Sequence, residues 1–156
     1  MANSANIEIE RRFLPDYPDF DLNVYPRVEI TQGYISFEPA IRLRGMGDEH
    51  YLTVKTRGTI IRGEYEIPLS KGQFDFLWLK TEPGTISKTR YKIPLDAGLT
   101  AELDIYYGDL QGLITVEVEF PTVKEAQSFI PPWWFGKEVT DDHRYANNNL
   151  AKYGKP

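Results

Sequence analysis

The sequence predicts a mainly β protein of the α+β class, and three observations support this prediction. Eight runs of residues alternate between apolar and polar or charged side chains, which is the two-residue period of a β-strand. Glycine, proline, aspartate and asparagine separate these runs, as they do at turns. Two segments, 70–80 and 122–130, instead show the apolar spacing of helices.

Length, charge and cysteine content narrow the classes of protein that remain. A chain of 156 residues suits a single domain spanning residues 1–156. The net charge of −5 disfavours a nucleic-acid partner, and no apolar run reaches the ~20 residues of a membrane-spanning helix, so we expect neither nucleic acid nor membrane as partner. The chain has no cysteine and starts without a secretory signal, so we expect a cytoplasmic protein.

The predicted strands are residues 7–15, 27–37, 40–45, 51–58, 61–69, 87–93, 101–107 and 114–120. In the first run, Glu8, Glu10 and Arg12 share one face, because side chains two residues apart point the same way. In the second run, Gln32 and Tyr34 form a polar but uncharged row. The turn between the third and fourth runs contains two glycines, which is typical of a hairpin.

The remaining six runs carry pairs of charges on one face. In the third to fifth runs these residues are Arg42 and Arg44, then Lys55 and Arg57, then Arg62, Glu64 and Glu66. In the last three runs they are Lys88, Arg90 and Lys92, then Glu102 and Asp104, then Glu117 and Glu119. Apolar residues occupy the alternate positions of each run, so every strand has one apolar and one ionic face.

The helices are predicted from caps as well as from apolar spacing. Segment 70–80 opens on Ser70, a favourable N-cap, and segment 122–130 has Thr122 and a glutamate at capping-box spacing. A third helix after Thr140 is a weaker prediction because its three asparagines are poor helix formers. The aromatic segment 131–135 is expected to pack on the outer face of the sheet.

Two arrangements of these strands remain open from the pattern alone. In an open sheet the ionic faces would meet water, whereas in a closed barrel they would face one another across a bore. A bore that holds both acids and bases needs water, ion pairs, metal ions or a bound anion. Carboxylates bind hard cations such as Mg²⁺ or Mn²⁺, and basic side chains bind phosphate oxygens, so this bore would suit a metal-bound polyanion.

Eight short motifs, in this order and spacing, resemble the CYTH superfamily of triphosphate tunnel metalloenzymes, most closely its small bacterial inorganic tripolyphosphatases. The motifs are EIERRF, IRLR, LTVK, RGEYE, KTRY, ELD, VEVEF and RYANNNLA, and the resemblance runs from about Ile7 to Lys152. It implies an eight-stranded antiparallel β-barrel tunnel, with a few helices packed outside and a C-terminal helix at one mouth.

The resemblance also implies a function and a set of site residues. The function is metal-dependent hydrolysis of a linear triphosphate, most directly inorganic tripolyphosphate to pyrophosphate and phosphate, with Mg²⁺ or Mn²⁺ as cofactor. The implied metal ligands are Glu8, Glu10, Asp104, Glu117 and Glu119. The implied substrate-binding residues are Arg12, Tyr34, Arg42, Arg44, Lys55, Arg62, Lys88, Arg90 and Arg144. The implied catalytic residues are Lys88, which would orient the attacking water, and Glu64 and Glu66.

Two departures from the family pattern keep alternatives open. Arg12 stands where the family has a lysine, and Thr31 stands where close relatives often have a basic residue. A nucleoside or thiamine triphosphatase, an adenylate cyclase, or a non-catalytic protein that binds polyphosphate or a nucleotide would carry similar motifs. The chain has two histidines, which excludes a histidine-rich metal site, and His143 is expected on the surface. The sequence also allows a homodimer.

Overall fold

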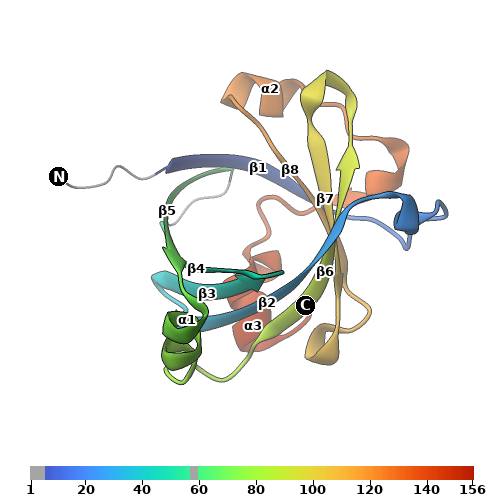
Figure 1. The fold of residues 1–156 in the computed structure, drawn as a ribbon. Helices are drawn as coiled ribbons and strands as arrows, with labels where there is room; N and C mark the ends of the chain where they lie inside the picture. Colours follow the sequence, from blue (N-terminus) through green and yellow to red (C-terminus); the bar gives the residue numbers. More distant parts are fainter. Residues whose placement is uncertain (1–5, 57–59) are drawn as a thin grey trace.

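The eight predicted strands form a closed antiparallel barrel in the computed structural model, which describes residues 6–56 and 60–156 (Figure 1). The strands are β1 (Asn6–Leu14), β2 (Arg27–Ser36), β3 (Ala40–Met46), β4 (Glu49–Lys55), β5 (Ile61–Leu69), β6 (Ile86–Pro94), β7 (Thr100–Tyr106) and β8 (Ile114–Glu119). Their order around the barrel is β5-β4-β3-β2-β6-β7-β8-β1, and β1 pairs back onto β5. Of the two arrangements that the pattern left open, the closed barrel is therefore confirmed.

Strand β1 closes the barrel because it pairs with a different neighbour along each half. Its first half lies against β5, where Glu8 is opposite Arg62. Its second half lies against β8, where Glu10 is opposite Glu119 and Arg12 is opposite Glu117. This pairing brings the charged residues of the first strand beside those of the fifth and the last, and their common face points into the barrel.

The predicted helices pack outside the barrel. Helix α1 (Lys71–Trp78) begins after the Ser70 cap and lies over β3, β4 and β5, and its Trp78 ring covers Gly33 of β2. Helix α2 (Val123–Ser128) begins after the Thr122 cap and packs beside β1 (Figure 1). Short 3₁₀ turns connect the elements, and they are η1 (Leu22–Val24), η2 (Asp96–Gly98), η3 (Gly108–Leu110), η4 (Trp133–Phe135) and η5 (His143–Tyr145).

The C-terminal helix α3 (Asn147–Tyr153) forms in spite of its asparagines. Leu150 is buried in a small apolar cluster with Ile86, Tyr106 and Leu110, and this packing compensates for weak helix propensity. Gly84 permits the close approach of the helix, since a Cβ at this position would lie within contact distance of the main chain at Ala151. The predicted helix at one mouth of the barrel is confirmed.

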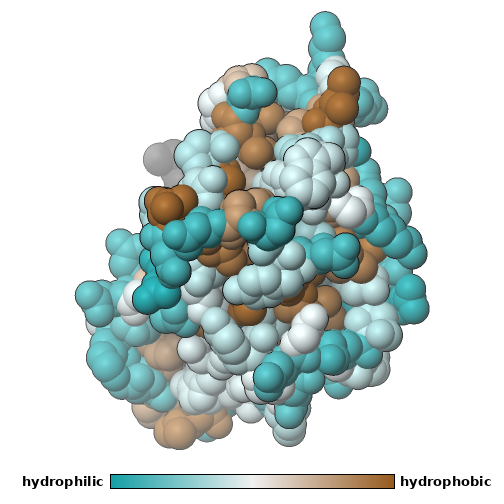
Figure 2. Space-filling view, turned by 90° about the vertical axis from the view of Figure 1, so that its right-hand side faces the viewer, coloured by the Kyte–Doolittle hydropathy of each residue, from teal (hydrophilic) through white to brown (hydrophobic). Residues whose placement is uncertain are grey.

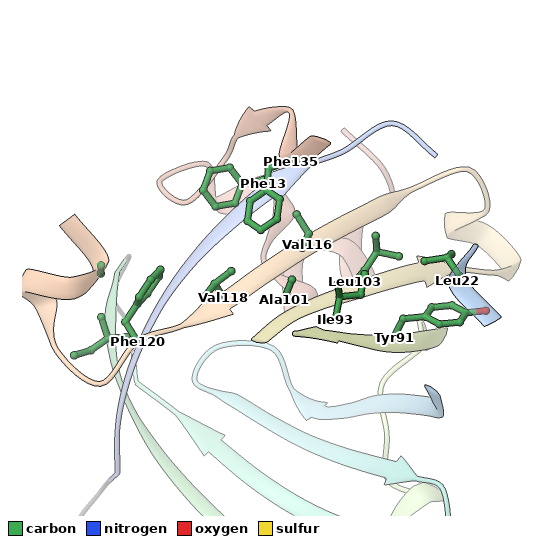
Figure 3. Packing of buried hydrophobic residues seen from close by; sticks show 12 residues of the cluster. Phe13, Leu22, Tyr91, Ile93, Ala101, Leu103, Val116, Val118, Phe120 and Phe135 are labelled. Carbon is green, nitrogen blue, oxygen red and sulfur yellow. The ribbon is translucent and has the colours of Figure 1, made fainter. Parts of the chain in front are cut away.

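The main hydrophobic core lies between the outer wall of the barrel and the segments that follow β8 (Figure 3). Outward-facing Phe13, Leu103, Val116 and Val118 pack there, and Phe135 from the aromatic segment covers Phe13. The predicted packing of segment 131–135 on the outer face is confirmed by this contact. Burial of the outer apolar face, rather than of the bore, supplies the hydrophobic stabilisation of the fold.

Several boundaries differ from the sequence prediction. Strand β4 ends at Lys55, Thr56 follows it, and the last two residues of the predicted run, Arg57 and Gly58, lie outside the described residues. A two-residue strand that the sequence did not predict, β9 (Lys137–Glu138), pairs with the end of β1. It is too short for an alternating pattern to reveal it.

On the face of the molecule shown in Figure 2, hydrophobic residues lie in separate groups between hydrophilic ones. Among the helices that the structure describes, none has the length and apolar character to cross a bilayer.

Candidate active site

The bore of the barrel contains a cavity of about 530 Å³. Six of the predicted substrate-binding residues with basic side chains line it, and these are Arg12, Arg42, Arg44, Lys55, Arg62 and Arg90. The strand carboxylates that line it are Glu8, Glu10, Glu102 and Glu117. Tyr34 also lines the cavity. Each of the eight strands β1 to β8 therefore contributes at least one side chain to the lining.

The carboxylates of β1 and β8 form one wall of the cavity, and basic side chains hold them. Arg62 forms ion pairs with both Glu10 and Glu8, and the ammonium of Lys55 lies 3.0 Å from Glu8. The guanidinium of Arg12 lies 2.9 Å from the carboxylate of Glu117. Each of these ion pairs is almost fully removed from solvent, where the attraction between opposite charges is stronger than in water.

The pKa values of two neighbouring carboxyl groups move in opposite directions. Burial, together with the negative charge of Glu117, raises the pKa of Glu10 to about 8, although Arg62 opposes this shift. Burial would also raise the pKa of Glu117, but Arg12 and the other nearby basic groups outweigh it and hold that pKa well below its usual value. Burial and its acidic neighbours therefore make Glu10 easier to protonate than Glu117.

The opposite wall, on β2 and β3, is basic. Arg42 and Arg44 project from β3, and the side-chain oxygen of Gln32 accepts a hydrogen bond from Nε of Arg44 at 3.0 Å. Within the described part of the chain, neither guanidinium forms an ion pair with a carboxylate. Burial, then the charges of Arg42 and Arg90, lower the pKa of Arg44 to about 9. Among the described residues, this wall therefore carries positive charges that no ion pair neutralises.

A buried ionic layer lies beneath the cavity. The carboxylate of Asp104 accepts hydrogen bonds from Nε and Nη2 of Arg90 at 2.8 Å and 2.9 Å, and the Lys88 ammonium lies 2.7 Å from it. The side chains of Lys88 and Asp104 are fully buried and are not among those that line the cavity. Asp104 therefore contacts the cavity through Arg90, which lines it.

The C-terminal segment supplies part of the lining that sequence reasoning missed. His143 lines the cavity, as do Asn147, Asn148 and Asn149 of α3. Their position could not be read from alternation, because they belong to a turn and a helix that the fold places over the bore. Glu102 was also missed, although it shares a strand face with Asp104, and that alternation was a usable signal.

Besides Lys88 and Asp104, four predicted site residues lie outside the cavity lining. Glu64 lies 3.4 Å from the Lys55 ammonium, whereas Glu66 is exposed on the same strand face. Glu119 is exposed at the end of β8, where burial and the nearby Glu8 raise its pKa. Arg144 is exposed and forms an ion pair with Asp142, in the turn beside the closed mouth.

The donor chemistry of the acidic wall fits a divalent cation. Glu8, Glu10 and Glu117 offer hard oxygen ligands to one cavity, and the raised pKa of Glu10 reflects carboxylates that a cation would neutralise. Among the described residues, no group of three or more acidic or histidine side chains is already arranged around a metal position. The carboxylates are instead held by Arg12, Lys55 and Arg62, which a cation would have to replace as partners.

The bore of this closed barrel combines an acidic wall with a basic wall, which is the chemistry that suits a polyanion together with cations. The chain is 45% identical to the inorganic triphosphatase of Nitrosomonas europaea over 148 residues, which cover 92% of this chain and 96% of that protein. It is 39% identical to the inorganic triphosphatase of Acetivibrio thermocellus over 150 residues, 93% of each chain. The chain therefore belongs to the inorganic triphosphatase family, and its resemblance to the triphosphate tunnel metalloenzymes is confirmed.

Solved structures agree with this assignment. The crystal structure of an inorganic triphosphatase is 42% identical, covers 96% of this chain and 97% of its own, and superposes with a TM-score of 0.70. The structure of an adenylyl cyclase-like protein from Hippeastrum covers 77% of this chain and 82% of its own with a TM-score of 0.62, but at 13% identity it supports only the fold. No family model matches the chain.

Proposed function

We propose that this protein hydrolyses inorganic tripolyphosphate to pyrophosphate and phosphate in a reaction that needs Mg²⁺ or Mn²⁺. Its membership of the inorganic triphosphatase family supports the substrate, and the charges of the bore support the mode of binding. We further infer that those predicted site residues that line the cavity, or lie directly beneath it, act together in this bore.

The observation that carries the proposal is the unpaired basic wall. Arg42 is buried and Arg44 half-buried in the same cavity, and among the described residues no carboxylate forms an ion pair with either of them. Nε of Arg42 and Nε2 of Gln32 are buried donors without a hydrogen-bond acceptor there. A bound polyanion would supply both the negative charge and the acceptors, because phosphate oxygens accept several charge-assisted hydrogen bonds at once.

The acidic wall would hold the metal. We infer that Glu8, Glu10 and Glu117 are its ligands, with Glu119 at the rim, and that Asp104 acts from beneath through Arg90. A bound divalent cation would neutralise phosphate oxygens and lower the pKa of a water molecule, which makes that water a better nucleophile.

The basic side chains would bind the substrate or hold the acidic groups in place. Arg42, Arg44 and Arg90 would bind the phosphate oxygens and stabilise the charge that spreads over them in the transition state. Lys55 and Arg62 are paired with carboxylates in this structure, and they would turn to the substrate when a cation takes over those carboxylates. Lys88 contributes from beneath by holding Asp104, and Glu64 by pairing with Lys55.

The test is a pair of isosteric substitutions in the acidic wall. Glu10→Gln and Glu117→Gln should reduce tripolyphosphate hydrolysis by at least about a hundredfold, because each removes a proposed metal ligand. Glu10→Gln should leave the fold intact, since burial already raises the pKa of Glu10 to about 8 and the amide resembles its protonated form. Glu82→Gln, at an exposed position, is the control. Full activity in both bore variants would refute the assignment.

Release of phosphate from tripolyphosphate, ATP and thiamine triphosphate, compared at equal concentration, separates the alternative substrates. Tight binding of tripolyphosphate without turnover in Mg²⁺ or Mn²⁺ would identify a non-catalytic binding protein instead. The cytoplasmic location, the single domain and a homodimer, all inferred from the sequence, stay predictions.

A further inference from the structure

Arg12 occupies the position where the family pattern has a lysine, and all three of its guanidinium nitrogens have partners within the protein. Nε donates to the carboxylate of Glu117 at 2.9 Å, and Nη2 lies 3.4 Å from Glu10. Nη1 donates to the main-chain oxygen of Tyr145 at 2.7 Å. A lysine has one ammonium nitrogen and cannot reach three such acceptors from one fixed position, whereas the planar guanidinium can.

The hydrogen bond from Arg12 to Tyr145 joins the bore to the chain segment that covers it. We call residues 139–153 the closing segment, because its residues His143 and Asn147 line the cavity. Its start is fixed to β1, where Val139 donates to the main-chain oxygen of Arg12 at 2.8 Å. Its far part is held by Leu150, which is buried, and by the hydrogen bond from the Tyr106 hydroxyl to Asn147 at 2.9 Å.

Between these two attachments, Tyr145 bonds to Arg12. This is a charge-assisted hydrogen bond, which is stronger than one between neutral groups. A cavity of about 20 Å³ lies beside Arg12 and is lined on its other side by Thr140, His143 and Ala146. The Tyr145 side chain packs against the apolar cluster around Leu150, and the hydrogen bond from Arg12 to its main-chain oxygen ties this part of the closing segment to the bore.

We propose that Arg12 is a positioning residue that fixes the closing segment over the bore, and that it does not bind the phosphates directly. Each of its three guanidinium nitrogens already has an acceptor in Glu117, Glu10 or Tyr145. Through this anchor it places His143 and the asparagines of α3 beside the substrate, a consequence that rests on the function proposed above. The anchoring itself is a property of the free protein and does not depend on that function.

Arg11, the next residue, provides a matched control. It points to the other face of β1, where Nη1 donates to the main-chain oxygens of Ala126 and Phe129 at 2.8 Å and 2.9 Å. Its remaining nitrogens bond to the carboxylate of Glu138. Arg11 therefore combines a carboxylate and main-chain oxygens as Arg12 does, but it anchors the segment around α2 on the outside of the barrel.

The test is hydrogen exchange measured by mass spectrometry on the free protein in EDTA. Arg12→Lys should raise the exchange rate in α3 by about tenfold, the effect of losing one hydrogen bond to a charged group. The amides of Leu150 and Gly154, which donate to main-chain oxygens within the closing segment, report on this region. Arg11→Lys should leave α3 unchanged and raise exchange around α2 instead.

Two outcomes would overturn the proposal. The first is wild-type exchange of α3 in both Arg12→Lys and Arg12→Met. The second is an increase that is the same throughout β6, β7 and α3, since this would make Arg12 a general stabilising residue of the barrel. The amides of β6 and β7 serve as the internal reference for α3. If a substitution destabilises the whole barrel, exchange rises equally in all three elements, which is the second of these outcomes.

Kinetics with tripolyphosphate and Mg²⁺ then separate anchoring from phosphate binding. Anchoring predicts that Arg12→Lys raises KM by a factor similar to the change in exchange and alters kcat much less. A direct phosphate contact predicts a raised KM with normal exchange of α3 in the free protein. If the wild-type protein shows no hydrolysis at all, the proposed function fails while the exchange result still decides whether Arg12 is the anchor.

Discussion

The ammonium of Lys88 lies 2.7 Å from the carboxylate of Asp104, and neither side chain is exposed to solvent. Arg90 binds the same carboxylate through two nitrogens, so one negative charge holds two positive charges beneath the cavity. Burial lowers the pKa of Lys88 to about 8, although the charge of Asp104 opposes this shift. Asp104 thus keeps Lys88 and Arg90 charged and in place.

Asp104→Asn should lower the free energy of unfolding by about 3 to 5 kcal/mol, the range for breaking a buried ion pair. The physical reason is that buried Lys88 would lose the carboxylate that favours its charged form, and Arg90 would keep only Glu102 as an ion-pair partner. Urea denaturation at pH 7 measures this change. Glu66→Gln makes the same chemical change at an exposed position and should stay within about 0.5 kcal/mol of the wild type. Equal stability of the two variants would contradict this reading of the ionic layer.

Arg42→Met should make the free protein more stable, by about 1 kcal/mol, because it removes a buried charge that has no carboxylate partner among the described residues. The charge of Arg42 also contributes to the lowered pKa values of Arg44 and Lys55. The same variant should gain less thermal stability than the wild type when tripolyphosphate is added. Differential scanning fluorimetry with and without tripolyphosphate measures both effects, and a less stable free protein would show that Arg42 has a partner in solution.

Gly84→Ala should displace α3 from the barrel. Gly84 has a φ of +97°, and an added Cβ would lie 2.1 Å from the main-chain oxygen of Ala151. Backbone strain and this contact together should cost more than about 2 kcal/mol. Gly98→Ala is the matched control, since Gly98 has a φ of +72° but no atom within 4 Å of the added Cβ. The difference between their unfolding free energies, measured in urea, isolates the contact with Ala151, and no difference would mean that α3 is not seated as described.

The ion pair of Asp142 with Arg144 predicts a specific pH dependence. The hydrogen bond from the Arg144 side chain lowers the pKa of Asp142 from 3.8 to about 2. Because the folded-state pKa is lowered, the contribution of this pair to stability is present above pH 3.8 and is lost as the pH falls through about 2. Carbon-13 NMR of the Asp142 carboxyl should give a midpoint near 2, which Arg144→Gln should move back toward 3.8. A wild-type midpoint near 3.8 would show that the turn at η5 differs in solution.

The alternation in the sequence was sufficient to assign strand faces. It placed Glu8, Glu10 and Arg12 on one face and Phe13 on the other, because a β-strand offers its side chains two directions only. Ser70 and Thr122 likewise indicated the N-caps of α1 and α2, since capping depends on residues a few positions apart. These features are local, and local sequence contains the information that determines them.

The closure of the barrel, the partners of each charge and the position of the closing segment were decided only by the tertiary structure. An open sheet has the same alternation as a barrel, and the pairing of Glu8 with Arg62 depends on strands that lie more than fifty residues apart. His143 and Asn147 carry no periodic signal, because their place over the bore is set by the burial of Leu150 and by the Arg12 contact. The sequence by itself determined which residues are charged and which way they point, and long-range packing decided which of them meet.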